Sequence, residues 1–425
     1  MDKAPHLGKY EIQKEIGKGA TGIVYLAKDT FTGRQLALKI LDPELFKDPE
    51  FGEVYRSQFM NEASLAGTLR HPHIVAILDA AVGEDSGYVA MELVTGGDLT
   101  QHIERDKLLP VADVLQIGFK CCGALDYAFR QGIFHRDIKP ANIMIVKGTT
   151  VKIADFGAAH LRRTNTTTTQ TLAVGSPYYM APEQIQGKEP NYHSDLYSLG
   201  VVLYQLLTGE RPFTANSLQM LMEKIVHQEP PPPSKLREGL PKEVDECVLR
   251  AMKKDPSQRY DYYGEFALDL ARAVKKVLPP EAIPDSEPHV ALRRSEMLAE
   301  LADAEIWELA RAARWSRVPK GTVIIREGDE GDSCFYLGEG TVKVHRKGVL
   351  LNLIKQSECF GEMAYIRGGD MPRHATVEAT SDVLLAEFRP LELMQMSPNA
   401  QLALTRAFVR NLVDRLQLAN TKLTQ

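Results

Sequence analysis

Hydrophobic residues recur at every second position in the first part of the chain, which is the period of a β-strand with one buried face. Residues 10–16 alternate in this way, and a β-branched, apolar run at residues 23–27 follows a glycine-rich turn. Two more short apolar runs occupy residues 35–40 and 88–94. The pattern predicts a strand at each place, with the first two forming a hairpin.

Helical periodicity separates and follows these strands. Between residues 48 and 70 the apolar residues recur at three- and four-residue intervals, so that one helix face carries Phe59, Ala63, Ala66 and Leu69. Residues 111–132 form a second, longer helical stretch.

A proline-rich, acidic stretch at residues 278–288 marks a change of pattern and is typical of a semi-rigid linker. Asp303 is expected to be the N-cap of a helix. Beyond Pro319 short apolar strands alternate with glycine turns, which predicts a β-sandwich or jelly roll. Residues 390–418 return to helical spacing, with apolar repeats at Leu402, Phe408, Leu412 and Leu416.

The overall composition excludes some classes of protein. The length of 425 residues predicts two or three domains, and the contents of 44% hydrophobic and 25% charged residues are ordinary for a globular protein. A net charge of -5 argues against nucleic acid as the main partner. No apolar run approaches the roughly 18 residues of a membrane span. Residues 1–10 lack the apolar core of a signal peptide, and the five cysteines form no C-x-x-C pair, so we expect a cytoplasmic protein.

The chemistry is concentrated in His135–Asn142 and in Asp155-Phe156-Gly157. H-R-D-x-x-x-x-N followed by D-F-G supplies one carboxylate beside an attacking hydroxyl, and an amide and a second carboxylate that can hold magnesium against phosphates. These residues resemble the catalytic core of the eukaryotic-type serine/threonine protein kinases. The resemblance implies a bilobal fold with Asp137 as the base and with Asn142 and Asp155 as the magnesium ligands. Lys139 is typical of the serine/threonine branch.

Gly17-Lys18-Gly19-Ala20-Thr21-Gly22 is by itself a weak signal, because dinucleotide-binding folds use G-x-G-x-x-G too. In those folds the third glycine begins a helix. Here it precedes a β-branched run, which favours a β-hairpin that covers the phosphates. The resemblance implies that ATP is contacted by Gly17, Gly19, Gly22, Val24, Ala37, Lys39 and the backbone of Glu92 and Val94. Met91 is then the gatekeeper.

Lys39 ends an apolar strand at the spacing that the family has between its glycines and its phosphate-binding lysine. Glu62 occupies the position of the acid that pairs with this lysine in the family. Without the resemblance, Lys39 reads as a solvated strand edge and Glu62 as a solvated helix acid.

Arg136 stands beside the base and suggests control by phosphorylation of the following loop, because a buried arginine next to a carboxylate requires an anion. Thr169 and Thr171 are the phosphorylation candidates, and the alternative for this threonine-rich stretch is a polar tether. By resemblance, Asp195 braces the catalytic loop and Arg259 pairs with Glu183.

Cys359–Ile366 and Met371–Val377 carry F-G-E-x-A and P-R-x-A-T, which resemble the phosphate-binding cassette of cyclic-nucleotide-binding domains. Arg373 can form a two-pronged pair with phosphate oxygens, and Glu362 can accept a hydrogen bond from a ribose hydroxyl. The implied ligand contacts are Gly361, Glu362, Met363, Ala364, Arg373, His374 and Ala375. His374 departs from the alanine of cAMP binders and the threonine of cGMP binders, so the choice between the two nucleotides stays open. The alternative is an empty jelly roll in which Glu362 pairs with Arg373.

We therefore expect a multidomain α+β chain. A kinase domain would occupy residues 10–277 (small lobe 10–94, large lobe 95–277), with a linker at 278–290. A jelly-roll cyclic-nucleotide-binding domain with flanking helices would occupy residues 291–425. The expected ligands are ATP, Mg²⁺ and cAMP or cGMP, and the expected partners are protein substrates with Ser/Thr acceptors. Two alternatives stay open: a non-catalytic nucleotide-binding scaffold, and an active kinase whose tail only forms a homodimer.

Overall fold

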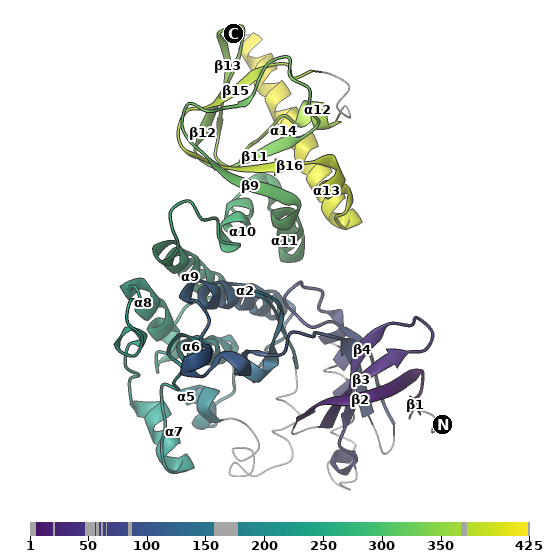
Figure 1. The fold of residues 1–425 in the computed structure, drawn as a ribbon, viewed down its shortest axis with the longest axis vertical. Helices are drawn as coiled ribbons and strands as arrows, with labels where there is room; N and C mark the ends of the chain where they lie inside the picture. The colour runs from purple at the N-terminus through teal and green to yellow at the C-terminus, as the bar shows by residue number, and fades with distance from the viewer. Residues whose placement is uncertain are drawn as a thin grey trace. The chain divides into compact units, whose positions relative to one another are not determined.

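The computed structural model describes residues 6–19, 22–46, 56, 59–60, 63–64, 66–83, 87–156, 177–366 and 372–423. The chain divides into two compact units, Met1–Leu278 and Pro279–Gln425. The first unit consists of a sheet-based small lobe and a helical large lobe, and the second is a β-sandwich with flanking helices (Figure 1).

The small lobe is built on one antiparallel sheet of order β1-β2-β3-β4-β6-β5. Its strands are β1 (His6–Leu7), β2 (Tyr10–Gly19), β3 (Gly22–Asp29), β4 (Gln35–Leu41), β5 (Ile77–Val82) and β6 (Gly87–Glu92). β2 and β3 pair directly, with Gly19 opposite Gly22. The predicted hairpin is therefore confirmed, because the third glycine begins a strand and not a helix.

One helix of this lobe is described only in part, at residues 56, 59–60, 63–64 and 66–68. The predicted apolar face is confirmed, since Phe59, Ala63, Ala66 and Leu69 are all buried. Phe59 and Ala63 pack in one cluster with Leu41 of β4 and Val89 of β6, so this face covers the sheet.

The large lobe is mainly helical. Its elements are α2 (Val111–Arg130), β7 (Ile143–Lys147), β8 (Thr150–Ile153), α5 (Pro182–Ile185), α6 (Tyr192–Thr208), α7 (Leu218–His227), α8 (Lys242–Ala251) and α9 (Tyr263–Val277). α6 packs against α2 and α8, and all its residues from Ser194 to Thr208 are buried. A helix that is buried on every side provides a rigid centre for the surrounding loops. It ends at Gly209, whose φ of 75° is the left-handed conformation that closes helices.

The second unit contains two antiparallel four-stranded sheets, which confirms the predicted β-sandwich architecture. One has the order β10 (Val323–Ile325), β15 (Thr376–Ala379), β12 (Thr341–Arg346), β13 (Val349–Lys355). The other has the order β14 (Cys359–Phe360), β11 (Cys334–Glu339), β16 (Val383–Phe388), β9 (Ala313–Val318). Phe335 and Leu337 of β11 belong to the core between the sheets, whereas Cys334 and Tyr336 belong to a helical core cluster. This alternation follows from the two-residue period of a strand.

The helices of this unit are α10 (Ser286–Arg293), α11 (Asp303–Ala312), α12 (Glu362–Ile366), α13 (Pro390–Met394) and α14 (Pro398–Leu423). Two sequence expectations are corrected here. Residues 286–290, which the linker prediction included, begin α10, where Ser286, Glu287 and His289 are buried. Asp303 is the first residue of α11, and Ala302 is the N-cap; the Asp303 carboxylate lies 2.8 Å from Nε2 of His289.

Candidate functional site

The loop His135–Asn142 brings the predicted catalytic side chains together in the first unit. Nζ of Lys139 lies 2.7 Å from Oδ2 of Asp137. Nδ2 of Asn142 donates to the backbone oxygen of Asp137 at 2.8 Å and to its Oδ2 at 3.3 Å. The Asp137 carboxylate is therefore fixed by a cation and an amide, and it is still partly exposed, so that an incoming group can reach it.

The buried carboxylate of Asp195 anchors the backbone of this loop. The two carboxylate oxygens of Asp195 accept hydrogen bonds from the backbone N–H groups of His135 (2.8 Å) and Arg136 (2.7 Å). The predicted bracing role of Asp195 is confirmed. Burial raises the pKa of the Asp195 carboxyl above its usual range, although both N–H groups act in the opposite direction. Arg136 has a φ of 65°, a conformation that costs a non-glycine residue free energy and that these anchors enforce.

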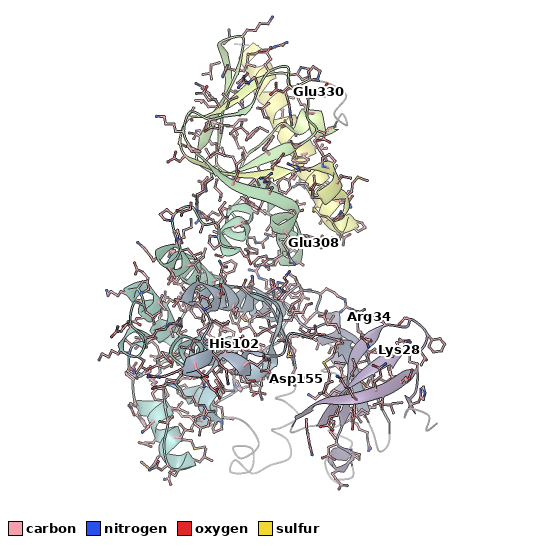
Figure 2. The ribbon with its side chains drawn as sticks, viewed as in Figure 1. Lys28, Arg34, His102, Asp155, Glu308 and Glu330 are labelled. Carbon is pink, nitrogen blue, oxygen red and sulfur yellow. The ribbon has the colours of Figure 1, made fainter. Side chains whose placement is uncertain are left out.

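Lys39 and Asp155 connect the two lobes. Nζ of Lys39 on β4 lies 3.0 and 3.1 Å from the two carboxylate oxygens of Asp155 (Asp155 is labelled in Figure 2). Burial alone would raise the pKa of Asp155, but the charge and hydrogen bonds of Lys39 keep it below its usual value. Asp155 is therefore ionised at neutral pH. Glu62, the expected partner of Lys39, lies outside the described residues.

The glycine-rich hairpin faces the same region of the small lobe. Gly17 and Gly19 lie in β2, and Val24 of β3 pairs with Lys39 of β4. Gly22 has a φ of 153°, and a Cβ there would lie 2.1 Å from the backbone oxygen of Ile40. The third glycine is therefore required by the close approach of β4, whereas a Cβ on Gly17 would meet only Val24, at 3.9 Å.

Glu92 at the end of β6 and Val94 just after it carry the backbone groups that were expected to contact adenine. Ala37 is buried and pairs with Met91 across β4 and β6. The N–H of Glu92 donates to the oxygen of Ala76 at 2.9 Å, so this amide is already occupied. The backbone N–H and C=O of Val94 have no hydrogen-bond partner among the described residues, which leaves an acceptor and a donor for a planar heterocycle.

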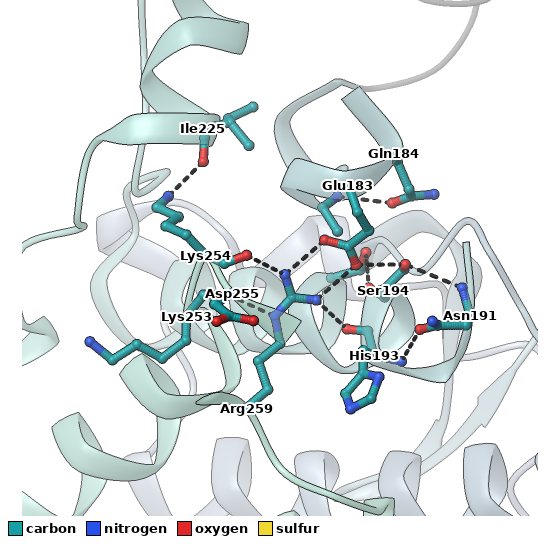
Figure 3. Close-up of polar contacts among 12 residues, drawn as sticks. Glu183, Gln184, Asn191, His193, Ser194, Ile225, Lys253, Lys254, Asp255 and Arg259 are labelled. Carbon is teal, nitrogen blue, oxygen red and sulfur yellow. Dashed lines mark hydrogen bonds and ion pairs between the residues drawn. The ribbon is translucent and has the colours of Figure 1, made fainter. Parts of the chain in front are cut away.

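Glu183 and Arg259 form a buried ion pair in the large lobe. Nη1 and Nη2 of Arg259 donate to the two carboxylate oxygens of Glu183, each at 2.8 Å, and Ser194 adds a third hydrogen bond at 2.7 Å (Figure 3). The predicted Glu183–Arg259 pair is confirmed. Burial would raise the pKa of Glu183, but the Arg259 guanidinium lowers it below its usual value.

The second unit contains a cavity of about 230 Å³. All seven residues that sequence analysis expected to contact a cyclic nucleotide line it: Gly361, Glu362, Met363, Ala364, Arg373, His374 and Ala375. The remaining lining is Ile325, Val344, Asn352, Ile354, Phe360, Pro372 and Val377. The lining thus combines a few polar side chains with a majority of apolar residues, which is the usual make-up of a small-molecule site.

Arg373 is the one guanidinium of this cavity's described lining, and it is buried with 8% exposure. Nη1 donates to the backbone oxygen of Gly361 at 3.3 Å, and Nη2 donates to Oγ of Ser333 at 3.1 Å. Both acceptors are neutral, so the positive charge keeps its attraction for an anion. A Cβ on Gly361, which has a φ of 74°, would lie only 3.0 Å from Nη1. Glycine therefore lets the guanidinium lie against the backbone.

Comparison with known proteins decides the family. Residues 10–266 match the protein kinase domain model, and residues 315–397 match the cyclic nucleotide-binding domain model. The chain belongs to the protein kinase domain family.

Several bacterial relatives carry the same kinase region. The serine/threonine-protein kinase PknB of Mycobacterium leprae is 40% identical over 288 residues, which are 66% of this chain and 46% of that protein. PknB of Mycolicibacterium smegmatis is 38% identical over 308 residues, covering 70% and 48%. A probable serine/threonine-protein kinase of Streptomyces coelicolor is 38% identical over 307 residues, covering 67% and 45%. This kinase-family chain spans less than half the length of these curated relatives.

A kinase domain implies ATP and a metal ion, and the residues here fit that requirement. Nδ2 of Asn142 is occupied by Asp137, so its Oδ1 is the atom free to bind a metal. Together with the ionised Asp155 it gives two hard oxygen ligands. No group of three or more His, Cys, Asp or Glu residues suited to a metal occurs in the described ranges. A site of two protein oxygens suits Mg²⁺, which commonly keeps waters and substrate phosphates as its other ligands.

The phosphorylation candidates Thr169 and Thr171 lie outside the described residues. Arg136, the residue expected to bind the phosphate, is among the described residues. Nε of Arg136 is buried without a hydrogen-bond partner in the described part of the chain. A charged donor in this position is energetically costly until an acceptor arrives.

Sequence reasoning missed three residues that shape these sites. Gln184 of α5 donates to the backbone oxygen of Arg136 at 3.4 Å, and Ser333 positions Arg373. Neither has a local sequence signal. Asn352 lines the cavity and does have one, because it interrupts the apolar run Val349–Ile354. Among the described residues, no helix has the length and apolar character needed to cross a bilayer.

Proposed function

We propose that the first unit is an ATP-dependent serine/threonine protein kinase that uses Mg²⁺. The observation that carries this proposal is the fixed Asp137 carboxylate, with Lys139 at 2.7 Å and Asn142 at 3.3 Å. The three groups meet the needs of phosphoryl transfer, in which positioning and charge neutralisation do most of the work.

In this proposal each residue has a separate task. Oδ1 or Oδ2 of Asp137 accepts the proton of the substrate hydroxyl, and Lys139 offsets the negative charge that collects beside it. Lys39 moves from Asp155 to the phosphates of ATP, which frees both Asp155 oxygens. Bound Mg²⁺, held by Asp155 and Asn142, supplies neutralisation of the phosphate charge.

The proposed activation step is autophosphorylation at Thr169 or Thr171. The unpartnered Nε of Arg136 supports it, because a phosphate next to this partly buried guanidinium would satisfy the donor and order the loop that carries Asp137.

The second proposed role is regulation by a cyclic nucleotide in the cavity of the second unit. A phosphate would bind Arg373, and a ribose hydroxyl would donate to Glu362. An effector of this kind shifts affinity or rate through a coupling free energy of about 1–3 kcal/mol. The domain division at 10–277 and 291–425 remains a prediction, as do the cytoplasmic location and a homodimer.

The test is transfer of the γ-phosphate of ATP to a serine or threonine acceptor, with and without magnesium, cAMP and cGMP. We expect transfer that requires magnesium and changes with one cyclic nucleotide. No transfer under any condition supports the non-catalytic scaffold. Transfer that is equal in all nucleotide conditions supports a kinase whose tail has another role, such as dimerisation.

A further inference from the structure

The side chain of Glu92, at the end of β6, is held by two other segments of the first unit. Its Oε1 accepts a hydrogen bond from the N–H of Ala76 at 2.8 Å and lies 2.6 Å from Nζ of Lys152 on β8. The same Nζ donates to the backbone oxygen of Ile74 at 3.4 Å. Glu92, Lys152 and residues 74–76 therefore form one connected group of polar contacts, the Glu92 network.

Backbone hydrogen bonds join residues 74–76 to the strands on both sides. The N–H of Glu92 donates to the oxygen of Ala76 at 2.9 Å, so these two residues are bonded in both directions. On the other side, the N–H of Val75 donates to the backbone oxygen of Ile153 in β8 at 2.9 Å. The segment thus connects β6 of the small lobe to β8 of the large lobe.

The ion pair in this network is largely shielded from water. The side chains of Lys152 and Glu92 are only 19% and 18% exposed. Ion pairs on the open surface contribute little, because water and salt screen them. In a partly buried position the hydrogen bond between two charged groups is stronger, and removal of one partner leaves the other charge poorly solvated. The pair is therefore suited to hold its two strands in place.

The network lies next to backbone groups that are expected to contact adenine. Val94 follows Glu92 by two residues, and its backbone N–H and C=O have no hydrogen-bond partner among the described residues. Lys152 precedes Asp155 by three residues, so β8 leads directly to an expected metal ligand. A side chain that ties Glu92 to β8 therefore fixes the adenine-contacting segment relative to the strand that leads to Asp155.

We propose that Glu92 and Lys152 are positioning residues for ATP, whose ion pair holds the backbone of residues 92–94 in the conformation that binds adenine. Neither side chain needs to touch the nucleotide. When only a fraction of the molecules has the binding conformation, the apparent affinity falls by that fraction. The groups that transfer the phosphate are unchanged. The inference rests on the proposed ATP-dependent kinase function and adds to it a role for these two side chains.

The test is steady-state kinetics of the full chain with ATP as the varied substrate. Lys152→Met keeps the aliphatic stem and removes the cation, whereas Glu92→Gln keeps an acceptor for the N–H of Ala76 and removes the charge. We expect each variant to raise the KM for ATP about fivefold or more with kcat unchanged, the lower end of a typical coupling between two sites. The double variant should exceed neither single variant, because all three lose the same ion pair. Lys152→Arg keeps the cation and should retain most of the affinity.

Lys107→Met is the matched control, because Lys107 forms a pair of the same length, 2.6 Å, with Glu104 on the exposed surface. It should keep both KM and kcat. Thermal unfolding confirms that all variants are compared at a temperature at which they are folded. An unchanged or lower KM for ATP in Lys152→Met and Glu92→Gln would overturn the positioning role. A loss confined to kcat, or the same rise in KM in Lys107→Met, would overturn it too.

Calorimetric titration with adenosine makes the test independent of phosphate transfer. Adenosine has no phosphates, so the two single variants should weaken its binding by the same factor by which they raise the KM for ATP. Adenosine binding that is equal in the variants and the unaltered chain would overturn the positioning role. If the unaltered chain transfers no phosphate but the variants weaken adenosine as expected, the proposed kinase activity fails and the positioning role stands.

Discussion

The carboxylate of Glu183 and the guanidinium of Arg259, 76 residues apart in the chain, form two parallel hydrogen bonds of 2.8 Å in the interior of the large lobe. Arg259 also donates to the backbone oxygens of Lys253 and His193, so it ties three segments together. Arg259→Ala leaves the acid buried without its partner and should lower the free energy of unfolding by about 3–5 kcal/mol. Urea unfolding of both proteins measures the difference.

A matched control is the surface pair of the exposed Arg130 and the partly buried Asp126, one turn apart on α2. Arg130→Ala should change stability by less than about 0.5 kcal/mol. Similar losses in the two variants would show that the buried pair contributes no more than a surface pair.

The second prediction concerns the base. Asp137→Asn keeps the shape of the side chain and removes its charge, so kcat should fall by about 10²- to 10⁴-fold while the protein stays folded. Lys139→Ala should also lower kcat. Because Lys139 acts through the Asp137 carboxylate, the double variant should lose little more than Asp137→Asn alone. If the fold-losses in kcat of the two single variants multiply in the double variant, the joint role is contradicted. Asp106→Asn on the exposed surface serves as the neutral control.

The third prediction separates two glycines of the same hairpin. Gly22→Ala forces a Cβ against the oxygen of Ile40 and should destabilise the small lobe by about 1–3 kcal/mol. In Gly17→Ala the new Cβ makes only an ordinary van der Waals contact, so the stability of the small lobe should be unchanged. The variant should raise the KM for ATP if the backbone at Gly17 approaches the phosphates. Thermal unfolding and the KM for ATP are measured for both. Equal stability of the two variants would contradict the role assigned to Gly22.

The fourth prediction concerns the pH dependence of stability. Burial lowers the pKa of Lys254 to about 8, and Nζ donates to the backbone oxygen of Ile225 at 2.6 Å. The unfolded chain therefore binds a proton more readily than the folded chain between pH 8 and the ordinary lysine pKa of 10.5. Stability should rise with pH across this window relative to Lys254→Met, because deprotonation removes a cost that only the folded state bears. Parallel curves for the two proteins would show that Lys254 titrates normally.

The fifth prediction tests the proposed activation. Phosphatase treatment of the unaltered protein should lower kcat roughly tenfold, in line with typical coupling free energies. Arg136→Ala should start at the lower rate and be insensitive to phosphatase, since the anion then has no partner. Mass spectrometry of Thr169→Ala and Thr171→Ala identifies the modified residue. An Arg136→Ala variant that still responds to phosphatase would refute this mechanism.

Local patterns predicted much of the fold and of the sites. The β-branched run after Gly22 predicted the hairpin, and the spacing of Phe59, Ala63, Ala66 and Leu69 predicted a buried helix face. The residues around Gly361 and Arg373 line one cavity, as their motifs implied. These predictions succeed because strand and helix periods are set by the neighbouring residues along the chain.

Other features depend on contacts between distant residues. The left-handed backbone of Arg136 has no local sequence signal, and its N–H is held by the carboxylate of Asp195, which lies 59 residues away in the chain. The start of α10 inside a proline-rich, acidic stretch and the neutral partners of Arg373 also depend on the folded environment.

The sequence by itself determined the order of the elements, the two kinds of unit and the chemical groups available for phosphate chemistry. Only the tertiary structure decided that Lys39 bonds to Asp155 and that Asn352 lines the same cavity as Arg373. The physical reason is that residue type and spacing fix which groups exist, whereas the partner of each group is fixed by strand register and burial.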